Sequence, residues 1–168
     1  MQRRTLVTIA VLAVIIAGVW GWDQMRHGLP RIPVPGDPRA LTGLPVVAVS
    51  LPGGVKIAAE VASTSKQQQR GLMFREIVVP RTGMLFIYDE EKYQQIWMKN
   101  VRVPLDIVFI SDDRKITHVV PNVAVPSPDT PDDAIPRING YGRYILELGA
   151  GEAERLGMQK GMHLDFER

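Results

Sequence analysis

The chain of 168 residues has no cysteine and no real excess of either charge. The absence of cysteine excludes disulfides, thiolate metal sites and a thiol nucleophile. Arg3 and Arg4 account for the whole basic surplus, because without them 18 of the 20 Lys and Arg residues remain against 18 Asp and Glu. A basic face does not follow from this composition, so we expect no nucleic-acid partner. The length is that of one domain with a tail.

Motifs for catalysis and cofactor binding are missing as well. The sequence contains no Gly-x-Ser-x-Gly, no His-Glu-x-x-His and no glycine-rich phosphate loop, which argues against nucleophilic and zinc-dependent hydrolysis. We therefore expect no cofactor, no resident metal and no catalytic residue. A fold-assembled acid–base pair, such as Asp106 with Glu147, stays open as an alternative.

One long apolar run is present, at the N-terminus. Residues 5–22 carry no charge and follow Arg3 and Arg4, and as a helix they reach about 27 Å, which is close to the thickness of a hydrocarbon core. Basic residues in front of such a helix favour a cytoplasmic N-terminus. We predict that residues 1–22 anchor the chain in the cytoplasmic (inner) membrane by a single pass, with the remainder in the periplasm or outside. A cleaved signal peptide, followed by secretion, is the alternative.

Proline is concentrated in two segments, which hold ten of the 13 prolines. Residues 23–45 have no apolar period and are predicted to be an extended, semi-rigid linker. Residues 121–136 are predicted to be a long loop inside the domain. A loop of that length is either functional or a plain solvated connection.

Residues 46–168 are predicted to form one mainly β domain. Alternating apolar residues indicate a hairpin over residues 46–50 and 55–61. A capping box over residues 65–68 predicts a short helix to about Met73, in which Gly71 implies a close packing neighbour. Further strands are expected at Met84–Tyr88, Gln94–Met98, Leu105–Ile110, Ile116–Val120, Tyr144–Leu148 and Met162–Phe166, with a second short helix at Glu152–Leu156. This set predicts a compact β-sandwich or barrel-like domain with one or two short helices.

Five short motifs over residues 46–166 carry a family resemblance: Arg70-Gly71-Leu72-Met73, Gly83-Met84-Leu85-Phe86, Trp97-Met98-Lys99-Asn100, Pro104-Leu105-Asp106-Ile107, and Leu146-Glu147-Leu148 with Ala150-Gly151. In this order they resemble the bacterial and archaeal family called domain of unknown function 192. The resemblance implies a mainly β, sandwich-like single domain and implies no activity. Val101 stands where the family usually has Thr, and Gly161-Met162 stands where it usually has Gly-Asp, so no role is carried over for that hydroxyl or carboxylate.

The Trp97 motif suggests a ligand site. On a strand, Trp97 and Lys99 point to one face while Met98 and Asn100 point to the other. An accessible Trp beside a Lys suits a ring or a sugar that carries an anionic group. The competing interpretation is that Trp97 fills the core while Lys99 lies in solvent.

Asp106 interrupts an apolar strand and shares a face with Val108 and Ile110, so it is expected to be partly buried. A buried carboxylate needs partners, and the candidates are Arg70, Lys99 and the backbone amides of the turn at residues 100–104. Either Asp106 fixes that turn, or it orients Lys99 or Arg70 toward an anionic ligand.

The methionines allow a further hypothesis. Met73, Met84 and Met98 lie in three of the motifs and, with Trp97 nearby, could bind Cu(I) through soft thioether sulfur. The simpler interpretation is that they are flexible core residues.

The sequence therefore favours a membrane-anchored, extracytoplasmic ligand-binding or interaction module. Its candidate binding residues are Arg70, Trp97, Lys99, Asn100 and Asp106, for an unknown small anionic or ring-bearing ligand or for a protein partner. The alternatives are an enzyme that uses the Lys99/Asp106 region and a Met/Trp-based Cu(I)-binding protein.

Overall fold

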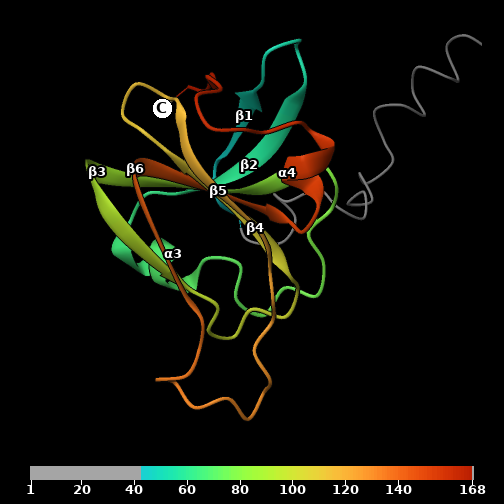
Figure 1. Cartoon of the computed structure of the whole chain (residues 1–168), viewed down its shortest axis with the longest axis vertical. Coiled ribbons are helices and arrows are strands. Elements are labelled where there is room, and N and C mark those ends of the chain that lie inside the picture. The colour runs from blue at the N-terminus through green and yellow to red at the C-terminus, as the bar shows by residue number, and fades with distance from the viewer. Residues whose placement is uncertain (1–42, 168) are drawn as a thin grey trace, which may run out of the picture. The chain divides into compact units, whose positions relative to one another are not determined.

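A computed structural model of the chain describes residues 43–167 (Figure 1). The predicted anchor over residues 1–22 and almost all of the predicted linker over residues 23–45 lie outside the described residues. Within the described part of the chain, no helix is long and apolar enough to cross a membrane.

The strands form one six-stranded sheet in the order β1-β2-β3-β6-β4-β5. Strand β2 runs parallel to β3, and every other neighbouring pair is antiparallel. The strands are β1 (Val46–Ser50), β2 (Lys56–Ala62), β3 (Thr82–Trp97), β4 (Leu105–Ile110), β5 (Ile116–Val123) and β6 (Arg137–Gly149). The helices are α3 (Ser65–Arg70) and α4 (Glu152–Arg155).

The prediction of a mainly β domain with two short helices is confirmed, and the β1–β2 hairpin has the expected place. A sandwich of two sheets is not formed, because all six strands of the described chain are hydrogen-bonded into a single sheet. The two strands predicted at residues 84–88 and 94–98 are one 16-residue strand, β3, with an irregularity between Ile87 and Lys92. The strand predicted at residues 162–166 is reduced to two isolated bridges, one from Asp165 to Ser50 of β1 and one from His163 to Lys115, just before β5.

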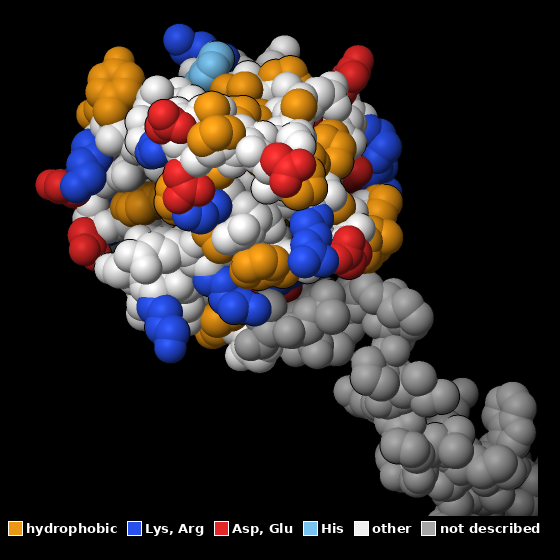
Figure 2. Space-filling model, turned by 90° about the horizontal axis from the view of Figure 1, so that it is seen from below, with side chains coloured by type: hydrophobic (Ala, Val, Ile, Leu, Met, Phe, Trp, Pro, Cys, Tyr) orange, Lys and Arg blue, Asp and Glu red, His pale blue; other side chains and the backbone are white. Residues whose placement is uncertain are grey.

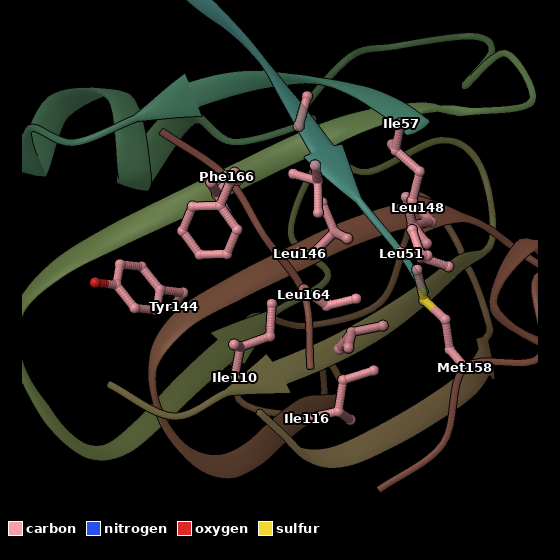
Figure 3. Close-up of a cluster of buried hydrophobic side chains, with 14 of the residues drawn as sticks. Leu51, Ile57, Ile110, Ile116, Tyr144, Leu146, Leu148, Met158, Leu164 and Phe166 are labelled. Atoms are coloured by element: carbon pink, nitrogen blue, oxygen red, sulfur yellow. The ribbon is translucent and has the colours of Figure 1, made fainter. Parts of the chain in front are cut away.

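Each face of the sheet carries its own apolar layer, because successive strand side chains point to opposite sides. Figure 3 shows the first layer, in which Tyr144, Leu146 and Leu148 of β6 contact the C-terminal segment through Leu164 and Phe166. The second layer includes Phe86 of β3, Ile145 of β6, and Ile107 and Phe109 of β4. The sheet is therefore buried on both faces, and α3 lies on the side of the second layer (Figure 1).

The first half of β6 packs closely against β4. The ring of Phe109 lies so close to Gly140 that a Cβ atom at that position would be 2.4 Å from two ring carbons. Only glycine allows this part of β6 to approach β4 so closely.

Helix α3 begins with a capping box one residue earlier than predicted. The Thr64 hydroxyl accepts from the Gln67 amide at 3.3 Å, and the Gln67 carboxamide oxygen accepts from the Thr64 amide at 2.9 Å. The helix ends at Arg70 rather than near Met73, because Gly71 has a positive φ of 44°. The expected close neighbour of Gly71 is the ring of Phe86.

Candidate functional site

A cavity of about 250 Å³ opens between α3 and the far end of β3. Helix α3 and the turn after it form one wall, and residues 95–97 of β3 form another. Phe86 and Tyr88, from the first half of β3, line the interior together with Glu147 from β6. The irregularity in β3 bends the strand, so that one strand contributes both to the interior and to a wall.

Glu147 is a carboxylate placed in an apolar layer. Glu147 is 4% exposed, and it lies opposite Met84 of β3 in the β3–β6 register. Among residues 43–167, no group donates a hydrogen bond to its side chain. Burial raises the pKa of Glu147 to about 8, against a smaller lowering by the Arg75 guanidinium. At neutral pH the group is therefore mostly in its neutral, proton-donating form.

Arg75, the cation that acts on Glu147, makes its own hydrogen bonds to a different carboxylate. One guanidinium nitrogen of Arg75 donates to both oxygens of Glu60, at 2.6 and 2.7 Å. The Glu60 side chain is fully buried and that of Arg75 is 13% exposed. Separating a buried pair of this kind is strongly unfavourable, so Arg75 stays with Glu60 and does not satisfy Glu147.

Tyr88 places a hydroxyl group in the interior of the cavity. Its burial, and secondly the nearby Glu147 carboxylate, raise the pKa of the phenol to about 12. The hydroxyl therefore keeps its proton throughout the physiological range. A molecule in the cavity would meet this hydroxyl together with the Glu147 carboxyl group.

Basic side chains surround Trp97 at the edge of the cavity. The Lys99 Nζ atom lies 5.1 Å and the Arg137 Cζ atom 5.4 Å from the centroid of the Trp97 ring, both within the range of cation–π attraction. Arg70, the last residue of α3, is exposed and lines the cavity from the other wall. The rim is therefore basic while the interior holds a carboxyl group.

The structure separates the residues predicted to bind a ligand. Arg70 and Trp97 line this cavity, whereas Lys99 and Asn100 line a second groove of about 540 Å³ beside the loop that precedes β6. Lys99 forms an ion pair with Asp132 of that loop. The Lys99 ammonium also lies over the Trp97 ring, but Lys99 is in the turn after β3 and not on the strand that the sequence predicted for it.

Asp106, the fifth predicted residue, lies in neither hollow. Its carboxylate is fully buried and accepts hydrogen bonds from the backbone amides of Asn122 and Ala153, both at 2.8 Å. These amides belong to the end of β5 and the start of α4, not to the turn at residues 100–104. Neither Arg70 nor Lys99 is bonded to it. In this structure Asp106 therefore joins three elements of the fold.

Asp106 and Glu147 do not form the acid–base pair that the sequence left open. In the β4–β6 register Asp106 faces Leu148, while Glu147 faces Ile107. Leu148 belongs to the first apolar layer and Ile107 to the second. The two carboxylates therefore point to opposite faces of the sheet.

The three methionines have different surroundings. Met84 and Met98 are buried in the second apolar layer, as core residues would be. Met73 is half-buried, and its sulfur accepts a weak hydrogen bond from the Asn100 side-chain amide at 3.8 Å. Within the described residues, no group of three or more His, Asp or Glu side chains is arranged to hold a metal ion. Copper binding stays a prediction.

Tyr88 was not among the site residues predicted from the sequence, and Glu147 was predicted only as a possible acid–base partner of Asp106. A signal for Glu147 was present, because it is the single charged residue in the apolar run Tyr144–Leu148. Such a residue is either paired or part of a site. Which of these applies depends on what covers that face of β6, and no local pattern shows this.

Two solved structures are similar to this chain in fold and, at 29 and 32% identity, in sequence. A crystal structure from Sinorhizobium meliloti 1021, described as a candidate transcription regulator, is 32% identical with a TM-score of 0.63; the match covers 72% of this chain and 92% of that one. A crystal structure of a protein of unknown function from Novosphingobium aromaticivorans DSM 12444 is 29% identical with a TM-score of 0.64, over 74% of this chain and 88% of that one. No curated protein matches. The model of the DUF192 family, described as Uncharacterized ACR, matches residues 48–166, and the chain therefore belongs to this family.

Proposed function

We propose that this domain binds a small organic molecule in the cavity between α3 and β3, and that Glu147 is the group that selects it. The observation that carries the proposal is a buried carboxyl group that no residue of the described chain satisfies, and that lines a cavity open to solvent. A buried polar group without a partner costs about 1 to 3 kcal/mol. The carboxyl group lines a cavity open to solvent, so a ligand that displaces this solvent and supplies a hydrogen bond recovers part of this free energy.

The walls of the cavity suit the apolar part of such a ligand. Leu72 from the turn after α3, and Ile96 and Val101 near the end of β3, present aliphatic surface, and Phe86 and Trp97 present aromatic surface. A mostly apolar cavity with a few polar groups is the usual form of a small-molecule site. We therefore propose this cavity as the binding site of the ligand-binding module that the sequence predicts.

We also propose a cellular location for the domain. The apolar run over residues 5–22 behind Arg3 and Arg4 supports a single-pass anchor in the cytoplasmic membrane, with the domain on the outer side. Membrane fractions washed with alkaline carbonate should retain the chain, and external protease should digest the domain in spheroplasts. Recovery of an N-terminally shortened chain in the periplasmic fraction would instead support cleavage.

We do not extend a role in transcription from the Sinorhizobium meliloti protein to this chain. Residues after the first 22 carry equal numbers of acidic and basic side chains. On the face shown in Figure 2, the two kinds are interspersed rather than gathered by sign. A nucleic-acid surface needs a basic stripe or patch.

The binding proposal is tested by thermal unfolding of the detergent-solubilised full chain against a metabolite collection. Compounds that raise the melting temperature of the wild type are repeated on Glu147→Gln and on the control Glu152→Gln. Glu152 is about as buried but lies at α4, and Arg155 and the Arg81 amide hydrogen-bond to it. We expect the shift to be lost in Glu147→Gln and kept in the control. Equal shifts in all three proteins would place the ligand elsewhere.

Proton transfer is a second candidate function at the same place. A carboxyl group with a pKa of about 8 in a cavity, beside a phenol, is an arrangement that acid–base enzymes use. Each compound found by the thermal screen should therefore be incubated with the protein and analysed by NMR. Conversion of a compound by the wild type but not by Glu147→Gln would identify an enzyme. If no compound is converted, the domain binds its ligand without reacting with it.

A further inference from the structure

We infer that the ligand of this cavity is a zwitterion of amino-acid size, with its protonated nitrogen against Glu147 and its acidic group at Arg70. The inference rests on the proposed binding function and adds the chemical class of the ligand.

The two charged residues of the cavity lie at its opposite ends. Among its lining residues, Glu147 is the single acid and Arg70 the single base. Glu147 lies inside, 4% exposed, whereas Arg70 is exposed at the last position of α3. The cavity is thus negative at its inner end when Glu147 is ionised, and positive at its mouth. A ligand of complementary charge places a cation at the inner end of the cavity and an anion at its mouth.

Two of the three amide side chains of the lining already have partners within the described chain, and the third, Gln69, is exposed. The Gln68 amide nitrogen donates to the Ile87 carbonyl at 2.8 Å, and the Gln95 amide nitrogen donates to the Asn139 side chain at 3.0 Å. Within the described chain, no ion pair or hydrogen bond involves the side chain of Arg70. Glu147 and Arg70 are therefore the two charged groups left for a ligand.

The carboxyl group at the inner end of the cavity favours a cationic group on the ligand. Arg75 acts on Glu147 from a distance but donates its hydrogen bonds to Glu60. An ionised Glu147 thus has no cation in contact with it, and a buried carboxylate is stable only when it is paired. An ammonium group of the ligand would supply three N–H donors and one positive charge. The Tyr88 hydroxyl, beside it, can accept one of those hydrogen bonds.

The size and the lining of the cavity limit what can bind between the two charged groups. A volume of about 250 Å³ admits a single small molecule. The aliphatic and aromatic walls between the inner carboxylate and the outer guanidinium would contact an apolar side chain. This combination favours an apolar amino acid over a simple amine or a simple acid.

The experiment uses two matched sets of probes on the detergent-solubilised full chain. The first set is leucine, 3-methylbutylamine, which lacks the carboxylate, and 4-methylpentanoate, which lacks the amine. The second set is phenylalanine, phenethylamine and 3-phenylpropanoate. Isothermal titration calorimetry at pH 7, in two buffers of different ionisation enthalpy, gives affinity and the number of protons exchanged. We expect one amino acid to bind, its deaminated analogue to bind at least tenfold more weakly, and close to one proton to be released on binding, because Glu147 must ionise.

Three variants assign the contacts. Glu147→Gln should weaken the amino acid at least tenfold and should abolish the proton release. Arg70→Met should weaken the amino acid several-fold and leave the amine unchanged. Lys66→Met is the control, because Lys66 is exposed on the same helix but does not line the cavity. This variant should bind all probes as the wild type does.

The outcomes separate the ligand class from the binding function. Tighter binding of a deaminated acid, or uptake of a proton on binding, would overturn the zwitterion and would indicate a neutral Glu147 that donates to an acceptor. No binding of any of the six probes, together with Glu147-dependent binding of other compounds in the thermal screen, would also overturn it but would leave the cavity as a ligand site. An absence of any Glu147-dependent binding would overturn both proposals.

Discussion

Replacing Glu147 with glutamine should change how the stability of the domain depends on pH. The carboxyl group has an ordinary pKa of 4.5 when exposed, and burial raises its pKa to about 8 in the folded chain. Between these two values the folded state holds a proton that the unfolded state has released. The stability of the wild type should therefore fall as the pH rises from about 4.5 to about 8, and should level off above that. Glutamine cannot ionise, so the variant lacks this contribution.

The size of the effect follows from the two pKa values. One pKa unit corresponds to about 1.4 kcal/mol. Between pH 5 and pH 8 the wild type should therefore lose about 3 to 4 kcal/mol relative to Glu147→Gln. This is a large part of the stability of an ordinary domain, and it corresponds to a relative change in melting temperature on the order of 10 °C.

The assay is urea and thermal unfolding from pH 3 to pH 9, monitored by near-ultraviolet circular dichroism. Glu152→Gln is the control with the opposite sign. Burial alone would raise the pKa of Glu152, but hydrogen bonds from Arg155 and the Arg81 amide outweigh it and hold that pKa below its ordinary value. The stability due to Glu152 is therefore present above its ordinary pKa and is lost in acid. Parallel curves for the wild type and Glu147→Gln across this range would refute the burial argument.

Three further substitutions test the structural roles of other residues by the same unfolding measurements. Asp106→Asn should lose about 2 kcal/mol, because the amide oxygen cannot replace a carboxylate that accepts from two backbone amides; ligand affinity in the cavity should stay unchanged, and a loss of affinity at full stability would contradict this. Gly140→Ala should lose about 3 kcal/mol of unfolding free energy, because its Cβ would overlap the buried ring of Phe109. A variant as stable as the wild type would show that this part of β6 can move away from β4. Arg75→Met should lose about 3 to 5 kcal/mol by removing two hydrogen bonds to the buried Glu60, and it should also raise the pKa of Glu147 further; a wild-type midpoint would argue against this pair.

The candidate site is built from residues that are far apart in the chain. Glu147 is on β6, Tyr88 is on β3, and Arg70 ends α3. Trp97, Lys99 and Asn100 were grouped from the sequence because they lie within one four-residue motif, but β3 ends at Trp97, and Lys99 and Asn100 line the second groove instead of the cavity. Proximity along the chain was a poor guide here, because a turn can send neighbouring side chains in different directions.

The amino-acid sequence by itself determined the class of the domain, the family and the faces of its strands. The period of two placed Asp106 on the same side as Val108 and Ile110, and the structure buries all three. Local patterns have this power because side-chain direction within one strand depends only on the backbone.

Only the tertiary structure decided which strands are neighbours and what covers each face of the sheet. The parallel contact between β2 and β3 and the insertion of β6 between β3 and β4 join residues far apart in the chain. These contacts carry α3 over the second apolar layer, and they enclose Glu147 in a cavity instead of leaving it in water. The pKa of that carboxyl group depends on the groups around it, so it follows from packing and not from its place in the sequence.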